Sequence, residues 1–170
     1  EIGVWGREPG KGTIRIGDFA LLSPGVRISA SDEIIIGDGV MMANGCYVTD
    51  SDWHTLYDRT RRSLTPTPVA LEKNVWLGDG VTILKGVTVG ENSVIAARSV
   101  VTRDIPKNSV AAGNPARIIK KLDADLEFVT RGELFSDPSS VLSFYDAVDR
   151  EVLSKNSLVK WILSLIWPSA

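Results

Sequence analysis

The chain has a single histidine, His54, in a segment that also carries carboxylates and aromatic side chains. Asp52 and Trp53 come directly before it, and Tyr57 follows three residues later. An imidazole can take a proton from a hydroxyl group near neutral pH and release it afterwards, and such general-base catalysis contributes about 10²–10⁴-fold to a rate. We therefore expect His54 to be a catalytic base, with Asp52, Trp53 and Tyr57 as contacts for the acceptor substrate.

A catalytic imidazole needs a partner that fixes which ring nitrogen carries the proton. Asp50, Asp52 and Asp58 are within reach in the sequence, and a backbone carbonyl would serve equally well. The sequence leaves these alternatives open, because each aspartate is also a common type of solvated or turn-capping residue.

Composition excludes several other kinds of site. With one cysteine, Cys46, and one histidine, the chain cannot form an internal disulfide or a zinc site with several Cys or His ligands, and we expect no metal. The formal net charge of −2 is unlike that of a nucleic-acid-binding domain, so we expect no nucleic-acid partner. Hydrophobic residues make up 44% of the chain, which is typical of a globular protein.

A six-residue repeat runs through most of the sequence. In the second half, aliphatic residues recur at every sixth position, at Leu77, Ile83, Val89, Ile95 and Val101. The same spacing occurs upstream at Ile16, Leu22 and Ile28 and, after two extra residues, at Ile36, Met42 and Val48. Six is not a helical period, whereas a short strand followed by a tight corner fits it.

Three such units would close one triangular coil of about 18 residues, and stacked coils would bury a continuous ladder of aliphatic side chains. The repeat therefore predicts a mainly β fold, a parallel β-helix, over residues 1–122. An ordinary β-sandwich with regularly spaced strands is the alternative, but its turns would be longer and less periodic.

The repeat stops after Val48, and we expect residues 51–72 to form a protruding loop. A loop of that length within a regular solenoid is commonly functional. His54 lies six residues after Val48, so we expect it at the edge of a coil. Trp53, Tyr57 and the three arginines of the loop suit a sugar, an anionic glycan or an aromatic drug alike.

The repeat resembles that of the hexapeptide-repeat acyltransferases, whose aliphatic-Gly-x4 units form a left-handed parallel β-helix. The likeness covers about residues 14–122 and includes two further stretches, residues 99–106 and 111–119. Within the family, the chain is most similar to the galactoside, maltose and xenobiotic acetyltransferases. The resemblance implies an acetyl-CoA-dependent O-acetyltransferase acting on a sugar or polysaccharide precursor. It also implies direct attack on the thioester with His54 as the base, and a homotrimer with active sites between neighbouring subunits.

The family pattern also implies which residues contact acetyl-CoA. Trp76 would line the pantetheine arm, and the small residues Gly78 and Ala97 would let that arm approach the coils. Polar and basic residues occupy the other coenzyme-contacting positions: Thr102, Arg103, Arg117 and Lys120. The alternative interpretation of residues 117–121 is a solvated exit from the last coil.

One position departs from the family pattern. Asp79 stands where some sugar acetyltransferases have a serine that helps to stabilise the oxyanion, and an ionised carboxylate would repel that charge. We therefore expect a backbone N–H near Gly78 or Gly80 to provide this stabilisation. Cys46, the only candidate nucleophile, is expected near a corner of a coil, and we expect no covalent acyl-enzyme.

Three other functions stay open. They are N-acetylation of a nucleotide-linked amino sugar, acetylation of a xenobiotic such as an antibiotic, and a non-catalytic role as a β-helix subunit of an assembly. The β-helix carbonic anhydrases are a poor match, because they bind zinc with three histidines and this chain has one.

Residues 123–170 are expected to form a helical C-terminal extension. Asp137 followed by Pro138 is a typical helix start, and apolar residues at helical spacing continue to about Leu153. A second apolar segment, residues 158–167, is too short to span a bilayer.

The function of residues 158–167 has two interpretations. The segment either covers an end of the β-helix or a subunit interface, or it rests on a membrane surface through Trp161 and Trp167 with Lys155 and Lys160. The sequence shows no secretory-signal pattern and no membrane-spanning apolar stretch. We therefore expect a cytoplasmic protein, with the cytoplasmic membrane face as an alternative location.

Overall fold

The computed structural model of the chain describes all residues except 7–11, 64, 155–156 and 167–170. Two compact units are present, Glu1–Gly132 and Glu133–Ala170. Lys155 and Trp167, which the membrane-surface interpretation uses, lie outside the described residues.

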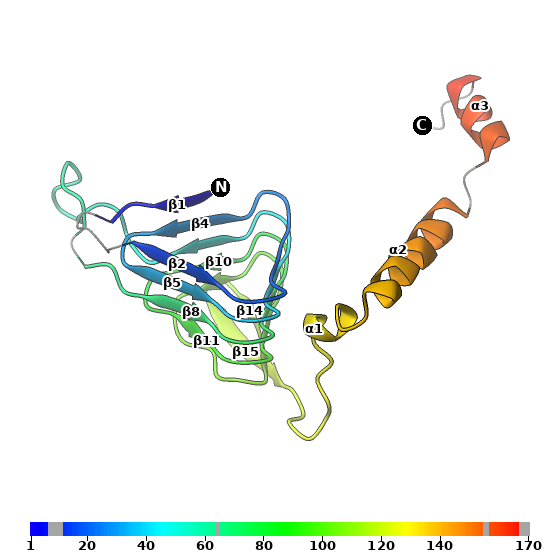
Figure 1. Ribbon diagram of the computed structural model, residues 1–170. Helices are drawn as coiled ribbons and strands as arrows, with labels where there is room; N and C mark the ends of the chain where they lie inside the picture. Colours follow the sequence, from blue (N-terminus) through cyan, green and yellow to red (C-terminus); the bar gives the residue numbers. More distant parts are fainter. Residues whose placement is uncertain (7–11, 64, 155–156, 167–170) are drawn as a thin grey trace. The chain divides into compact units, whose positions relative to one another are not determined.

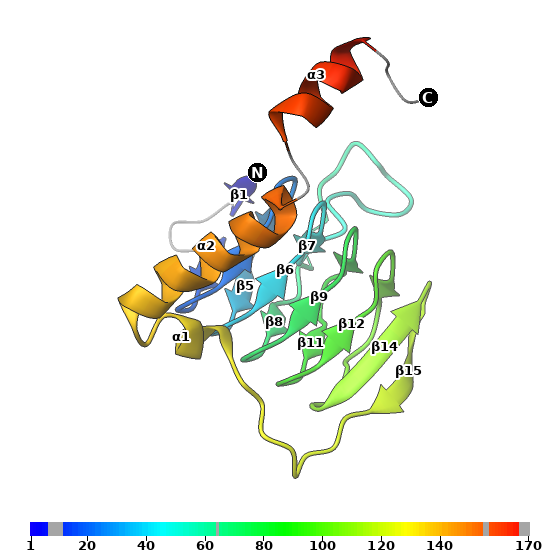
Figure 2. The same ribbon diagram turned by 90° about the vertical axis from the view of Figure 1, so that its right-hand side faces the viewer.

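The first unit is a parallel β-helix, in which strands of successive coils pair to form three sheets (Figure 1). Sheet A contains β1 (Ile2–Val4), β4 (Arg27–Ala30), β7 (Tyr47–Thr49), β10 (Thr82–Ile83) and β13 (Val100–Val101). Sheet B contains β2 (Thr13–Ile16), β5 (Glu33–Ile36), β8 (Val69–Leu71) and β11 (Thr88–Val89). Sheet C, which Figure 2 shows, contains β3 (Leu21–Leu22), β6 (Met41–Met42), β9 (Trp76–Leu77), β12 (Val94–Ile95), β14 (Ser109–Gly113) and β15 (Ala116–Lys121).

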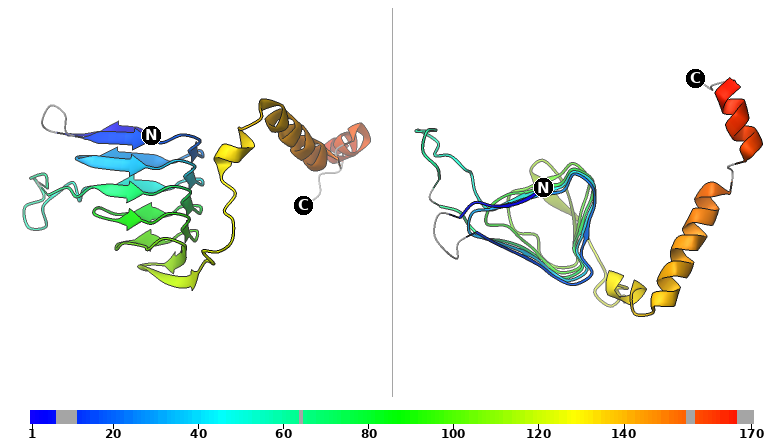
Figure 3. Two further views of the ribbon diagram at one scale, coloured as in Figure 1. Left: turned by 60° about the horizontal axis from the view of Figure 1, so that its bottom comes forward. Right: turned by 45° about the horizontal axis from the view of Figure 1, so that its top comes forward.

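From β1 to β13, successive strands belong to sheets A, B and C in turn, so the coils have a triangular cross-section (Figure 3). Residues of the six-residue repeat stack directly on one another from coil to coil. In sheet A, Val48 pairs with Ile28 on one side and with Ile83 on the other, and Val101 follows Ile83. This register confirms that the repeat builds a β-helix.

The aliphatic residues of the repeat form the core. From the second coil onward they are fully buried or nearly so: Ile28, Ile36, Met42, Val48, Leu77, Ile83, Val89, Ile95 and Val101. Ile16 differs, because it lies on β2, the edge strand of sheet B, and it is 44% exposed.

The interruption of the repeat is shorter than residues 51–72. β7 ends at Thr49 and β8 begins at Val69, so the protruding loop consists of residues 50–68. Leu71 is already buried in the core, six residues before Leu77. The residues before Glu72 therefore belong to the coil, because they continue the six-residue spacing backward from Leu77.

The last strand of the β-helix, β15, folds back against the strand before it, β14. β15 pairs antiparallel with β14, whereas the other strand pairs between sheet neighbours are parallel. Residues 117–121 therefore form an exposed edge strand of sheet C.

The helices are α1 (Arg131–Leu134), α2 (Pro138–Leu153) and α3 (Leu158–Ile166). The predicted start of α2 is confirmed, since Asp137 is its N-cap and accepts a hydrogen bond from the Ser139 backbone N–H at 2.9 Å. Hydrogen bonds from the side chain and backbone of Ser139 lower the pKa of Asp137. None of the helices in the described part of the chain has the length and apolar character needed to cross a bilayer.

Candidate active site

The loop of residues 50–68 leaves the β-helix at the corner between sheets A and B (Figure 3). Its two arms are joined by backbone hydrogen bonds from Ser63 N to Trp53 O and from Thr55 N to Arg61 O, both at 3.1 Å. His54 lies between these two bonds, in the protruding loop and not at the edge of a coil as its spacing suggested. The reason is that the chain leaves sheet A at Asp50, before the sixth-residue position is reached.

The imidazole of His54 has a backbone partner. Its Nδ1 lies 2.8 Å from the carbonyl oxygen of Arg59. A carbonyl oxygen can only accept, so Nδ1 carries the proton and donates it, which leaves the lone pair of a neutral imidazole on Nε2. Of the partners that the sequence left open for His54, the structure shows a backbone carbonyl. The ring is exposed, and its Nε2 is the proton acceptor.

The three aspartates near His54 have other partners. Asp52 forms an ion pair with Lys85 of the neighbouring coil. Asp58 pairs with Arg61 Nε at 3.0 Å and accepts a hydrogen bond from Thr60 Oγ1 at 2.5 Å. Asp50 is fully buried at the base of the loop.

A hollow of about 950 Å³ lies beside the loop. The lining residues come from the loop and from the adjacent coil: Asp52, His54, Thr55, Leu56, Thr60, Arg61, Arg62, Ser63, Thr65 and Lys85. Of the predicted acceptor contacts, only Asp52 lines this hollow. Tyr57 points fully into solvent, and Trp53 is half-buried at a positive φ of 65°.

Among the charged lining residues, Lys85 was not considered in the sequence analysis, and Arg62 was considered only as one of the three arginines of the loop. Lys85 lies two residues after Ile83, and Ile83 stacks on Val48, so the repeat register places Lys85 directly below the start of the loop. Counting from one coil to the next would thus have located it. Arg62 carries no such signal, because its place depends on how the loop folds.

The predicted coenzyme contacts lie on two parts of the β-helix. Trp76 is on β9 of sheet C and is 48% exposed. Gly78 and Ala97 stack at the corner between sheets C and A, so closely that a Cβ on Gly78 would lie 2.7 Å from the Ala97 nitrogen. Only glycine fits at this position.

The polar and basic residues predicted to contact the coenzyme, Thr102, Arg103, Arg117 and Lys120, are all exposed. Thr102 and Arg103 follow β13 at the corner between sheets A and B, and the register places Arg103 next to Lys85. Arg117 and Lys120 lie on β15, with the Arg117 guanidinium donating to the Ala116 carbonyl at 2.8 Å.

His54 and the residues predicted to contact the pantetheine arm therefore occupy different corners of one chain. His54 is at the corner between sheets A and B, whereas Trp76, Gly78 and Ala97 are on sheet C or at its corner with sheet A. The hollow beside His54 contains none of the predicted coenzyme contacts.

Cys46 is buried within the coil. Its Sγ donates to the carbonyl oxygen of Gly78 at 3.2 Å, and burial raises the pKa of the thiol. Both facts keep the sulfur protonated and inaccessible, so it is not suited to nucleophilic attack.

Two of the N–H groups near Asp79 are already used. Gly78 N donates to Ile95 O at 2.9 Å, and Gly80 N donates to Asn44 O at 2.8 Å. The Asp79 carboxylate accepts from Asn44 N at 3.0 Å. The N–H groups of Gly78 and Gly80 are therefore not available to an oxyanion, which leaves the Asp79 N–H between them among the expected donors.

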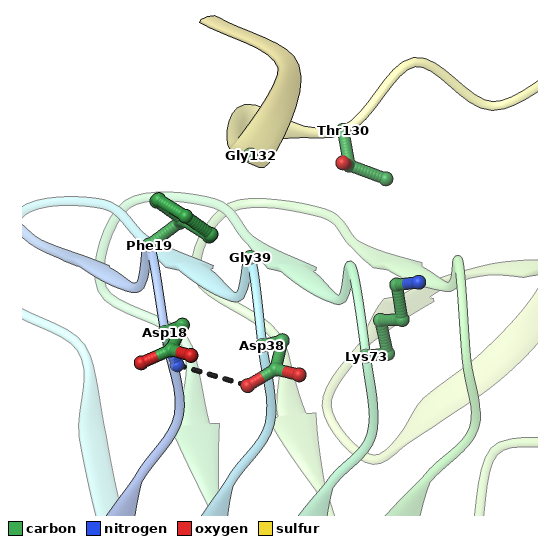
Figure 4. A pocket seen from close by; sticks show the side chains of 7 residues that line it. All are labelled: Asp18, Phe19, Asp38, Gly39, Lys73, Thr130 and Gly132. Carbon is green, nitrogen blue, oxygen red and sulfur yellow. Dashed lines mark hydrogen bonds between the residues drawn. The ribbon is translucent and has the colours of Figure 1, made fainter. Parts of the chain in front are cut away.

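A smaller hollow of about 170 Å³ lies at the corner between sheets B and C (Figure 4). Asp18, Phe19, Asp38 and Lys73 contribute to it, and Asp38 Oδ1 accepts a hydrogen bond from Asp18 N at 2.9 Å. It contains none of the predicted site residues, and it is smaller than a typical ligand pocket of about 300–1,000 Å³.

Similar sequences are acetyltransferases. Residues 68–103 match the family described as bacterial transferase hexapeptide (six repeats). Galactoside O-acetyltransferase of Escherichia coli K12 is 40% identical over 92 residues, which cover 53% of this chain and 45% of that protein. The chain spans about half the length of the curated relatives that it matches.

Solved structures agree with this similarity. A hexapeptide-repeat acetyltransferase of Vibrio cholerae O1 biovar eltor, in complex with acetyl coenzyme A, is 37% identical with a TM-score of 0.60, over 65% of this chain and 61% of that one. A maltose O-acetyltransferase of Clostridium difficile 630 is 34% identical with a TM-score of 0.50, over 72% of this chain and 71% of that one. The six-residue repeat, the parallel coils that it builds and these similarities show that the chain belongs to the left-handed β-helix family of hexapeptide-repeat acyltransferases.

Proposed function

We propose that this chain is an acetyl-CoA-dependent O-acetyltransferase acting on a hydroxyl of a sugar or polysaccharide precursor, with His54 as the general base. One observation carries the proposal: the hydrogen bond from His54 Nδ1 to the Arg59 carbonyl leaves Nε2 as the proton acceptor of a residue that lines a hollow of about 950 Å³. The names of the relatives support the reaction and the substrate class, since two of them are a galactoside and a maltose O-acetyltransferase.

In this mechanism, Nε2 of His54 accepts the proton of the acceptor hydroxyl while the hydroxyl oxygen attacks the thioester carbonyl carbon. The new C–O bond forms and the carbonyl oxygen takes the negative charge. Collapse of this tetrahedral species breaks the C–S bond, and the imidazolium returns the proton to the leaving thiolate. The products are an acetyl ester and CoA, and His54 is neutral again.

The oxyanion needs a hydrogen-bond donor in a fixed position. The Asp79 N–H, between the occupied N–H groups of Gly78 and Gly80, donates to no acceptor within the described residues. Because the Asp79 carboxylate is held by Asn44 N, it is directed to the neighbouring coil. We assign the Asp79 backbone N–H as the donor, so that an aspartate at this position is compatible with acetyl transfer.

The coenzyme would lie along sheet C and its corner with sheet A. Trp76 and the closely stacked Gly78 and Ala97 provide a flat surface for the pantetheine arm, and exposed Arg117 and Lys120 on β15 can pair with phosphates. Thr102 and Arg103 complete the proposed contacts from the next corner of the coil.

A complete site then requires more than one copy of the chain. His54 and the residues assigned to the pantetheine arm lie at different corners, and a homotrimer would place the loop corner of one subunit against the coenzyme corner of its neighbour. In this assembly residues 1–122 are the acyltransferase domain and residues 123–170 the helical extension. The cytoplasmic location and the membrane or interface role of α3 remain predictions.

The first test is calorimetric titration of the purified chain with acetyl-CoA and, in parallel, with CoA. We expect micromolar binding at about one site per chain, followed by CoA release in the presence of sugar acceptors. His54→Ala should bind acetyl-CoA normally but lose transfer. The absence of binding at millimolar acetyl-CoA would contradict the proposed function and favour a non-catalytic β-helix subunit.

A further inference from the structure

Arg62 lies directly opposite the catalytic base. His54 and Arg62 are an antiparallel pair, and the hydrogen bonds on either side of them join Trp53 to Ser63 and Thr55 to Arg61. This arrangement makes them a non-hydrogen-bonded pair, in which the Cα atoms are about 4.5 Å apart and the side chains project from the same face. Both side chains line the same hollow.

Among the described residues that line this hollow, the charged side chains form ion pairs except that of Arg62. Lys85 is neutralised by Asp52, and Arg61 by Asp58, whose carboxylate lies 3.0 Å from Arg61 Nε. Within the described part of the chain, the exposed guanidinium of Arg62 donates to no carboxylate and no carbonyl. The guanidinium of Arg62 is therefore available to bind a ligand in the hollow that His54 also lines.

We propose that Arg62 binds an anionic group of the acceptor, a carboxylate or a phosphate, and so selects acidic sugars or sugar phosphates over neutral sugars. The proposal rests on the function assigned above. A guanidinium donates two parallel hydrogen bonds to such a group, and these bonds are stronger than those between neutral partners. Because Arg62 and His54 are neighbours on one face, the anionic group and the reacting hydroxyl would lie on the same sugar unit.

The test compares acceptors that differ only in the charged group. Glucuronate, galacturonate and N-acetylneuraminate are measured against their methyl esters, and glucose 1-phosphate against methyl glucoside. We expect the wild-type chain to have a kcat/KM about 10–100-fold higher for the anionic member of at least one pair. Preference within the uronate pairs would identify a carboxylate acceptor, and preference within the phosphate pair a phosphate acceptor.

Three variants assign the preference to the guanidinium. Arg62→Gln should reduce kcat/KM for the anionic acceptor by about 10–100-fold and leave that for its neutral partner within about 3-fold. Arg62→Lys keeps the positive charge but cannot donate two parallel hydrogen bonds, so it should reduce kcat/KM for the anionic acceptor by an intermediate factor. Arg15→Gln, which removes an exposed arginine of β2 outside the hollow, should change neither.

Binding of acetyl-CoA separates the two proposals. If wild type and Arg62→Gln both bind acetyl-CoA but no anionic acceptor is preferred, or Arg62→Gln loses both members of a pair equally, the assignment of Arg62 is wrong. If neither protein binds acetyl-CoA, the proposed function itself fails.

Discussion

The buried carboxylate of Asp50 accepts a hydrogen bond from the backbone N–H of Ser31, a residue of the preceding coil, at 2.7 Å. Its second oxygen accepts from the backbone N–H of Asp32, also at 2.7 Å. Ser31 and Asp32 are the two extra residues that interrupt the upstream repeat, and Asp50 begins the long loop. The two irregularities therefore lie at the same corner, where one side chain joins them.

This contact predicts a structural role for Asp50. Asp50→Ala leaves two N–H groups without their acceptor, and we expect the free energy of unfolding to fall by about 1–3 kcal/mol. Chemical denaturation measures the change. Asp104→Ala is the matched control, since Asp104 also accepts a backbone hydrogen bond, from Thr88 N at 2.7 Å, but at the surface where water can replace it. Equal losses in the two variants would contradict this role.

The ionisation of Asp50 should give stability a defined pH dependence. Burial raises the pKa of Asp50 above its ordinary value of 3.8, despite the hydrogen bonds from Ser31 and Asp32 that act in the opposite direction. The folded chain then holds this proton more tightly than the unfolded chain. Its contribution to stability is complete below about pH 3.8 and is lost as the pH rises through the pKa of the folded state.

The comparison of wild type with Asp50→Asn isolates this effect. The difference in the free energy of unfolding, wild type minus variant, should be constant below about pH 3.8 and decrease as the pH rises above it. Denaturant titrations at several pH values provide the measurement. A difference that grows with pH would instead show a carboxylate stabilised in its charged form.

Removal of the proposed catalytic base, His54, should reduce the rate of acetyl transfer and leave coenzyme binding unchanged. His54→Asn keeps a side-chain donor that can reach toward the Arg59 carbonyl but has no basic nitrogen. We expect kcat to fall by about 10²–10⁴-fold, with the Kd for acetyl-CoA unchanged. Steady-state kinetics and calorimetry test the two halves of this prediction, and a variant with normal kcat would rule out His54 as the base.

The basic residues of β15 should determine coenzyme affinity. Arg117→Gln removes an exposed guanidinium, and we expect the Kd for acetyl-CoA to increase about 10-fold while kcat at saturating acetyl-CoA stays the same. The comparison with dephospho-CoA then identifies the phosphate involved, because the loss should be smaller for a ligand that lacks the contacted phosphate. An unchanged Kd would show that β15 is a solvated edge strand.

A trimer is also testable. Sedimentation velocity should give three times the mass of the chain. At acetyl-CoA concentrations well below the Kd of Arg117→Gln, mixed trimers of His54→Ala and Arg117→Gln subunits should be more active than the two variants assayed separately, because some interfaces then combine an intact loop with an intact β15. Mixed trimers without any recovery would contradict a site shared between subunits.

The sequence by itself determined the coil. Each six-residue unit has the same local pattern, an aliphatic side chain that points inward followed by a tight corner. The pairing of Val48 with Ile28 therefore follows from counting residues along the repeat. The N-cap at Asp137 is likewise local, because it depends on a side chain and a backbone N–H two residues apart. Such features could be predicted because their energies arise within one unit or between identical units.

Only the tertiary structure decided the chemistry at the loop. The partner of His54 proved to be a carbonyl, Asp52 proved to pair with Lys85, and Arg62 proved to face the imidazole. Asp50, one of three equivalent candidates in the sequence, proved to be buried. The repeat register places Lys85 near the start of the loop, but the loop itself has no repeat to constrain it. Which loop side chains meet Lys85, and which group His54 and Arg62 face, therefore depends on how the loop folds.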